Sequence, residues 1–366
     1  MKKVLAAVTV SVGTMIGAGY ASGREVAAYF GGSPSFVVPL ACGALMFALT
    51  AVLLGVGART KGTLCGRAAP VADCAMTVNA VIVLSAMMAG TDGALYDMTG
   101  VELPYGVMLC LVGIFVVRGG ARGLDKANIA MVPCIAATLA AVCVSAGIDL
   151  TAAPSLPELP AAFAYVSMNL LLGAGVLVTR RGMTRREVLA ASGISAAVIT
   201  ALLALICGAL PFAPEADMPL LVLASRTRVG YALYAVCLLC SIFTTMIGAL
   251  VTVRGAGEKK GKGSEYMLAA AFFGSLISVF GFGDIVNKSY PVIGALGCVY
   301  LIRCAAFLAP SRKQFFRKRD RAVHQRGEHA QSHRSGHDEV GIEHLPAVYD
   351  EVAQPRARNE IFAHDR

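Results

Sequence analysis

The chain has 366 residues, of which 56% are hydrophobic and 15% charged, and its mean hydropathy is +0.66. A soluble globular domain of this length does not carry so much apolar surface, so the composition predicts a helical membrane protein. The net charge of +9 is divided among short segments between apolar runs. This placement argues against a nucleic-acid partner and indicates the lipid bilayer instead.

Apolar runs of membrane-spanning length follow one another from residue 4 to residue 309. A helix that crosses the hydrocarbon core needs about 20 such residues. The runs are too uniform for the alternating strands of an outer-membrane barrel. Breaks at glycine, proline and charged clusters predict ten transmembrane helices, at 4–28, 35–57, 73–96, 102–118, 127–148, 160–180, 188–209, 229–253, 264–282 and 285–309.

The first of these spans contains four glycines between residues 13 and 23. One interpretation is close helix packing through small residues spaced four apart, as in Gly13/Gly17 and Gly19/Gly23. The other is a discontinuous helix, because glycine lets the backbone leave helical geometry. The amides and carbonyls freed at such a break bind polar solutes and cations in transporters.

Lysine and arginine are concentrated at the N-terminus and in alternate loops, at 59–67, 118–126, 180–186 and 254–262, with Arg226 and Arg228 as exceptions. By the positive-inside rule, this alternation places both termini in the cytoplasm and requires an even number of spans. After Pro310 the sequence becomes charged and polar. The predicted domains are therefore a transmembrane domain at 1–310 and a disordered cytoplasmic tail at 311–366.

The ten spans divide into two halves of matching spacing, 4–148 and 160–309, related by an offset of 156 residues. Because each half has five spans, the second half enters the membrane from the opposite side. The predicted architecture is thus a 5+5 inverted repeat. Such repeats are typical of secondary transporters, whose substrate sites lie near the midplane at the interface between the repeats.

Three short segments resemble a known family. They are Ile16-Gly-Ala-Gly-Tyr-Ala-Ser-Gly-Arg-Glu25, Tyr165-Val-Ser-Met-Asn169 and Val286-Asn-Lys-Ser-Tyr-Pro291. They look like the YkvI-like family of bacterial membrane proteins, which is distantly similar to LeuT-fold transporters of the amino acid–polyamine–organocation superfamily. The resemblance covers residues 1 to about 310. It implies an all-α, LeuT-like protein of the bacterial cytoplasmic membrane, with discontinuous first and sixth helices.

The resemblance also implies a sodium site between the first and eighth spans. Its ligands would be the carbonyls of Gly13 and Ile16 and the side chains of Ser241, Thr244 and Thr245. The last three lie on one helix face. In the alternative, these hydroxyls only bond carbonyls of their own helix. Some proton-coupled relatives have a lysine from span five at this site, and its lack in span five favours sodium as the coupling ion.

A substrate site is implied between the breaks of the first and sixth spans. The residues expected to line it are Ala18, Gly19, Tyr20, Ala21, Ser22, Ser167, Met168 and Asn169. The fold implies an amino acid or a related zwitterion as the small-molecule substrate, with no resident cofactor. The sequence leaves the oligomeric state open.

Five ionisable residues, Arg24, Glu25, Asp92, Asp284 and Lys288, fall in the outer ends of predicted spans. Charges inside spans are costly, so we expect them to form an extracellular gate with the pairs Arg24–Asp284 and Glu25–Lys288. In the alternative they simply reach toward the interface.

The resulting hypothesis is sodium-coupled uptake by alternating access. A proton-coupled or uncoupled exchanger with Glu25 as proton carrier, and a membrane sensor on the same scaffold, are the alternatives. An enzyme is disfavoured, because the spans contain no histidine, no Gly-x-Ser-x-Gly sequence and no paired midplane acids.

Overall fold

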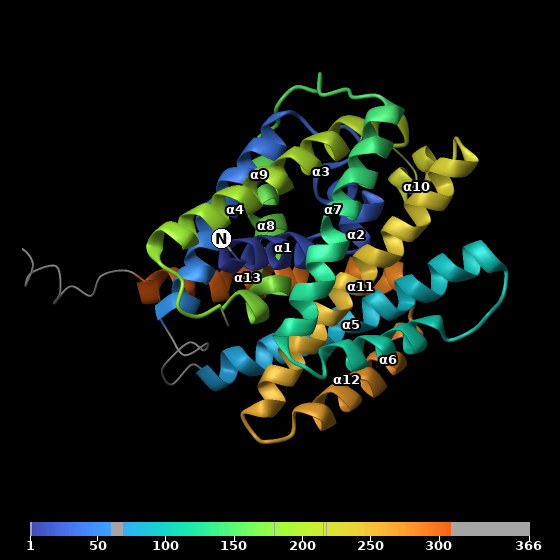
Figure 1. Ribbon diagram of the computed structural model, residues 1–366. Coiled ribbons are helices and arrows are strands. Elements are labelled where there is room, and N and C mark those ends of the chain that lie inside the picture. Colours follow the sequence, from blue (N-terminus) through green and yellow to red (C-terminus); the bar gives the residue numbers. More distant parts are fainter. Residues whose placement is uncertain (1, 60–68, 179, 215, 217, 309–366) are drawn as a thin grey trace, which may run out of the picture. The chain divides into compact units, whose positions relative to one another are not determined.

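The computed structural model describes residues 2–59, 69–178, 180–214, 216 and 218–308 (Figure 1). These residues all lie in one compact unit, Met1–Ala309. Their secondary structure is entirely helical. The predicted tail at 311–366 lies outside the described residues, so its disorder stays a prediction.

The helices in chain order are α1 (Lys2–Met15), α2 (Ala18–Ser22), α3 (Arg24–Phe30), α4 (Val37–Arg59), α5 (Ala69–Thr99), α6 (Tyr105–Val117), α7 (Ala121–Ala146), α8 (Glu158–Leu177), α9 (Arg185–Ala209), η1 (Leu210–Phe212), α10 (Pro219–Ala224), α11 (Arg228–Glu258), α12 (Gly263–Ser278) and α13 (Phe282–Leu308). Six segments in α4, α5, α7, α9, α11 and α13 are long and apolar enough to cross a membrane, and α6 is a shorter apolar helix. The chain is therefore a multi-pass helical membrane protein. Ten crossings and the inverted repeat stay predictions.

Several helices are longer than the spans predicted from hydropathy. The helix α7 begins at Ala121 rather than at 127, and α11 continues to Glu258 rather than ending at 253. In the extension of α11, Arg254 Nε lies 2.6 Å from Glu258 Oε1, one turn along the helix. Such pairs stabilise a helix surface in water. Charged residues thus end the apolar crossing, but they do not end the helix.

The predicted interruption of the first span is confirmed. The helix α1 ends at Met15, Gly17 has an extended backbone (φ −85°, ψ −174°), and α2 begins at Ala18. A second interruption follows at Gly23, whose φ of 76° lies in the left-handed region. A side chain there would be strained, which explains why glycine ends α2.

The predicted break in the sixth span is wrong. The helix α8 is continuous from Glu158 to Leu177 and passes through Ser167, Met168 and Asn169 without leaving helical geometry. The glycines of this span lie further on, where they admit neighbouring side chains. A Cβ at Gly173 would lie 2.7 Å from Thr14 Oγ1, and one at Gly175 would lie 2.4 Å from Thr252 Oγ1. These glycines serve close packing.

The helix α1 lies at the centre of the bundle (Figure 1), in contact with α7, α8, α9 and α11. Every residue from Ala7 to Met15 is buried. The break between α1 and α2 is therefore enclosed by protein, the condition under which irregular backbone is tolerated at membrane depth.

Candidate functional site

The break between α1 and α2 leaves backbone groups without helical partners. The Ile16 amide donates to the Val12 carbonyl at 3.0 Å, and the Ala21 amide donates to the Gly17 carbonyl at 2.9 Å. The last four carbonyls of a helix and the first amides of the next have no partner within their own helix. The carbonyls after Val12, including those of Gly13 and Ile16, are thus the ones available for a ligand.

Three hydroxyls were predicted to face this break. Among them, that of Thr245 lies beside the break and has no hydrogen bond in the described residues. A Cβ at Gly17 would lie 3.2 Å from Thr245 Oγ1. Thr245 is 3% exposed, and its Oγ1 has no hydrogen-bond partner among the described residues. An unbonded buried hydroxyl is costly and calls for an explanation such as a bound ion.

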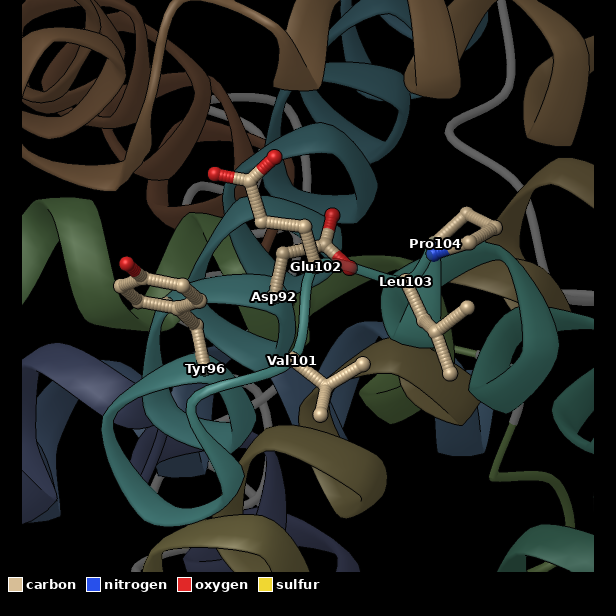
Figure 2. A pocket seen from close by; sticks show the side chains of 7 residues that line it. Asp92, Tyr96, Val101, Glu102, Leu103 and Pro104 are labelled. Atoms are coloured by element: carbon tan, nitrogen blue, oxygen red, sulfur yellow. The ribbon is translucent and has the colours of Figure 1, made fainter.

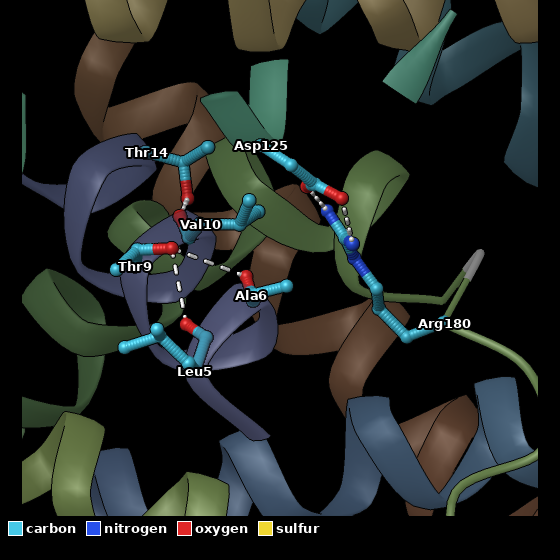
Figure 3. A network of polar contacts seen from close by, with 7 residues as sticks. All are labelled: Leu5, Ala6, Thr9, Val10, Thr14, Asp125 and Arg180. Atoms are coloured by element: carbon cyan, nitrogen blue, oxygen red, sulfur yellow. Dashed lines mark hydrogen bonds and ion pairs between the residues drawn. The ribbon is translucent and has the colours of Figure 1, made fainter. Parts of the chain in front are cut away.

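The other two hydroxyls bond carbonyls of their own helix. Ser241 Oγ donates to the Cys237 carbonyl, and Thr244 Oγ1 donates to the Ser241 carbonyl, each at 3.0 Å. For these two residues the structure matches the alternative interpretation. Figure 3 shows the same arrangement below the break, where the hydroxyls of Thr9 and Thr14 donate to carbonyls one turn earlier in α1.

One polar residue at the break was not predicted from the sequence. Asn128 of α7 is fully buried, and neither its Oδ1 nor its Nδ2 has a hydrogen-bond partner within the described ranges. A Cβ at Gly13 would lie 2.3 Å from Asn128 Oδ1. The predicted span began at 127 and placed Asn128 at the membrane surface. Since α7 begins at Ala121, Asn128 lies two turns inside the helix.

Thr245 of α11 and Asn128 of α7 approach the end of the first helix from two helices. Asn128 lies at Gly13, inside α1, and Thr245 lies at Gly17, at the break that follows α1. The available atoms around this break are a hydroxyl, a carboxamide oxygen and main-chain carbonyls. Such neutral oxygens are ligands for hard cations. No carboxylate balances a second charge among them, so the set suits a monovalent ion.

The residues of α2 that were predicted to hold substrate are all buried, and α2 is tied to two helices. Tyr20 Oη donates to the Ile199 carbonyl of α9 at 3.2 Å. Tyr234 Oη of α11 donates to the Ala21 carbonyl at 2.5 Å. Ser22 Oγ bonds locally, to the Gly19 carbonyl at 3.1 Å.

The predicted substrate residues of α8 run alongside the first span in the opposite direction. Gly173 lies against Thr14, and Met168 Sδ accepts a hydrogen bond from Tyr29 Oη at 3.5 Å. Asn169 Nδ2 donates to the Tyr165 carbonyl at 3.1 Å, as an unbroken helix permits. The buried oxygens Ser167 Oγ and Asn169 Oδ1 have no hydrogen-bond partner in the part of the chain that the structure describes.

Of the two predicted gate pairs, Glu25–Lys288 is not formed, and Arg24–Asp284 stays a prediction. Lys288 Nζ lies 2.9 Å from Asp284 Oδ2, with both side chains largely exposed. The predicted pair Glu25–Lys288 is therefore wrong, because Lys288 bonds one turn back along its own helix. The Arg24 guanidinium lies against the backbone of α13, 3.2 Å from the position of a Cβ on Gly283.

Asp92 lies beside the start of α6. Its Oδ1 accepts a hydrogen bond from the Gly106 amide at 2.7 Å and so satisfies one of the first amides of that helix. A cavity of about 460 Å³ opens there, lined by Asp92, Tyr96 and Glu102 with Val101, Leu103 and Pro104 (Figure 2). This capping bond gives Asp92 a structural role, and its place in a gate stays a prediction.

Glu25 is buried, not at an outer surface. It is 3% exposed, and its carboxyl group is hydrogen-bonded to Tyr290 of α13. The side chain folds back over α2, so a Cβ at Gly19 would lie 2.1 Å from Glu25 Oε1. Glu25 thus lies among the residues predicted to hold substrate.

Beyond the C-terminal end of α8, an ion pair joins Asp125 of α7 to Arg180. Arg180 Nη1 and Nη2 bond Asp125 Oδ2 and Oδ1 at 3.0 and 2.5 Å (Figure 3). Both side chains are mostly buried, at 14% and 24% exposed. A two-bond arginine–carboxylate pair fixes orientation as well as distance.

Known proteins resemble the chain in sequence and in fold. No family model matches the chain. The chain is 23% identical over 340 residues to the uncharacterized membrane protein YkvI of Bacillus subtilis (strain 168), which covers 83% of this chain and 96% of that one. The predicted resemblance to YkvI is confirmed.

Solved structures of transporters share the fold. MhsT in complex with L-phenylalanine has a TM-score of 0.63 at 16% identity, covering 83% of this chain and 88% of that chain. The chain has the LeuT-type fold. A Na⁺-coupled sialic acid symporter has a TM-score of 0.59 at 12% identity over 80% and 76% of the two chains. A manganese transporter of Eremococcus coleocola has a TM-score of 0.58 at 16% identity over 85% and 80%.

Proposed function

We propose that the protein is a secondary transporter that couples the uptake of a small organic solute, an amino acid or a related zwitterion, to sodium. The observation that supports the proposal is a pair of buried side chains beside the break of α1, Asn128 at Gly13 and Thr245 at Gly17, whose polar atoms have no hydrogen-bond partner among the described residues. Broken helices that hold ions and substrates are the working parts of such transporters. The alternation of basic loops supports a proposed location in the bacterial inner membrane with both termini in the cytoplasm.

The ion is proposed to bind between α1 and α11, with Thr245 Oγ1, Asn128 Oδ1 and the carbonyls of Gly13 and Ile16 as ligands. The neutral oxygens explain why a single positive charge is preferred. Binding would bring α11 and α7 against the end of α1. That closure would in turn fix the position of α2, where the substrate residues lie.

The test is uptake of radiolabelled amino acids into proteoliposomes under an inward sodium gradient. We expect the wild type to take up solute with sodium and not with potassium. Asn128→Ala is expected to raise the half-saturating sodium concentration by about tenfold or more, because a ligand to a buried charge contributes about 1.5–3 kcal/mol.

Asn79→Ala is the matched control for that variant. Asn79 of α5 is also buried, with an oxygen that has no partner in the described residues. It is not among the residues nearest to Gly13 or Gly17. Its sodium dependence should equal that of the wild type. If uptake does not depend on sodium for any solute in a broad panel, sodium coupling is refuted.

Proton coupling or uncoupled exchange is the second candidate, and the burial of Glu25 favours it over the remaining alternatives. A buried carboxyl group that gains and loses a proton during transport would make uptake depend on pH. In that case Glu25→Gln should abolish the pH dependence while sodium has no effect.

A further inference from the structure

Glu25 is a buried acid with one oxygen unaccounted for. Tyr290 is hydrogen-bonded to its carboxyl group, yet Oε2 has no hydrogen-bond partner in the described segments. Tyr290 is the partner of the Glu25 carboxyl group, and no lysine or arginine pairs with this group among the described residues. An isolated charge in an apolar interior is very costly, so this carboxylate needs a cation when it is ionised.

Aromatic residues lie near Glu25. Tyr29 is one turn further along α3, and Tyr290 is hydrogen-bonded to the carboxyl group. The ring of Tyr165 meets those of Tyr29 and Phe30 edge to face, with centroids 5.4 and 5.5 Å apart. Aromatic rings near an acid favour an organic cation, whose charge is attracted to the faces of such rings. A proton alone would need no such rings.

The position of Glu25 fits a substrate contact. Its carboxyl group lies against Gly19 of α2, one helical turn or less from the break at Gly17. Tyr29, on the same helix as Glu25, reaches Met168 of α8. Glu25 thus lies against α2, and its own helix α3 contacts α8, and these are the two helices whose residues were expected to hold substrate. Thr245 lies at Gly17 instead, two residues before Gly19.

We propose that Glu25 is the counter-charge for a cationic nitrogen of the substrate. This inference rests on the proposed transport function and narrows its substrate class to small ammonium compounds, meaning amines and amino acids. An ammonium group is required for binding, and a carboxylate on the ligand is not. The cation would occupy the free side of the carboxylate at Oε2 and lie against the neighbouring rings.

The test is ligand-induced thermal stabilisation of the purified full-length protein with three probes that share one ring and chain. Phenethylamine carries the ammonium group alone, phenylalanine carries both charged groups, and phenylpropionate carries the carboxylate alone. We expect the first two to stabilise the wild type and the third to have no effect. Glu25→Gln should weaken binding of phenethylamine about tenfold or more, since an unpaired partner of a buried charge pair costs at least that.

Glu158→Gln is the matched control. Glu158 of α8 is also buried, at 8% exposed, but its carboxylate accepts hydrogen bonds from the Ser35 amide and hydroxyl at 3.3 and 2.5 Å. This variant should bind phenethylamine as the wild type does. Tyr290→Phe provides a second variant at the site, because it keeps the charge and removes one hydrogen bond, and its affinity should fall less than that of Glu25→Gln.

The outcomes separate this inference from the transport proposal. Stabilisation by phenylpropionate equal to that by phenethylamine, or undiminished phenethylamine binding by Glu25→Gln, would overturn the role of Glu25. Failure of both ammonium probes to stabilise the wild type would overturn it as well. Binding that depends on Glu25 without any uptake into proteoliposomes would support the site and refute transport.

Discussion

Replacing Thr245 by valine gives the sharpest test of the ion site. The variant should be at least as stable as the wild type without sodium and less stable than the wild type with sodium. Valine keeps the branched shape and removes only the hydroxyl. In the protein without sodium, Thr245 Oγ1 is buried and has no partner in the described residues, which costs about 1–3 kcal/mol. Thr245→Val should therefore be at least as stable as the wild type when sodium is replaced by potassium.

With sodium the order should reverse. A ligand present at a hundred times its Kd stabilises a protein by about 2.7 kcal/mol. Loss of one ligand to a charge, worth about 1.5–3 kcal/mol, raises the Kd about tenfold to a hundredfold. At a sodium concentration a hundred times the wild-type Kd, Thr245→Val should then lose about half or more of the stabilisation by sodium.

Thr244→Val is the matched control in the adjacent position. Thr244 Oγ1 donates to the Ser241 carbonyl, so its removal should cost about 0.5–1.5 kcal/mol with or without sodium. The assay is thermal unfolding of the detergent-solubilised protein across a sodium titration at constant ionic strength. If the sodium midpoint of Thr245→Val stays within about twofold of the wild type, the assignment of Thr245 is refuted.

Three further variants test other parts of the arrangement. Gly19→Ala should abolish ammonium-probe binding in the same thermal assay, because its Cβ would lie 2.1 Å from Glu25 Oε1 and displace the carboxyl group, whereas Gly93→Ala, with open space at its Cβ, should not. Asp125→Ala should lower the free energy of unfolding by about 1.5–3 kcal/mol, measured by denaturant titration, since it leaves Arg180 without its two-bond partner. Deletion of 312–366 should leave uptake into proteoliposomes unchanged, and loss of a cellular response with unchanged uptake would favour the sensor.

The sequence predicted the helices well where hydropathy and glycine act directly on the backbone. The run from Gly13 to Gly23 predicted the broken first span, because several glycines in an apolar helix weaken one short stretch of it. The break that the family resemblance implied in the sixth span is wrong. There Gly173 and Gly175 lie against threonines of α1 and α11, and only the folded neighbours reveal that packing.

The candidate site was predicted less completely, since it depends on which side chains are left without partners. Ser241, Thr244 and Thr245 are indistinguishable by spacing, yet the first two donate to their own helix and the third does not. Asn128 could have been found by treating any amide near an apolar span as a candidate ligand. Glu25 is next to Arg24 in sequence, and the left-handed turn at Gly23 is what sends its side chain back toward α2.

The proposed ion site and the proposed substrate site differ in how they balance charge, and each therefore binds a different kind of cation. The break at Gly17 offers neutral oxygens, which hold one hard cation. The region beyond it offers the single carboxylate of Glu25, which requires a positive group as its partner. Because α2 lies between the two and is bonded to α9 through Tyr20 and to α11 through Tyr234, a shift of α11 on binding the ion would also move the wall of the substrate site. A ligand couples to another only by favouring the same conformation, so this shared element is where sodium and an ammonium substrate would be linked.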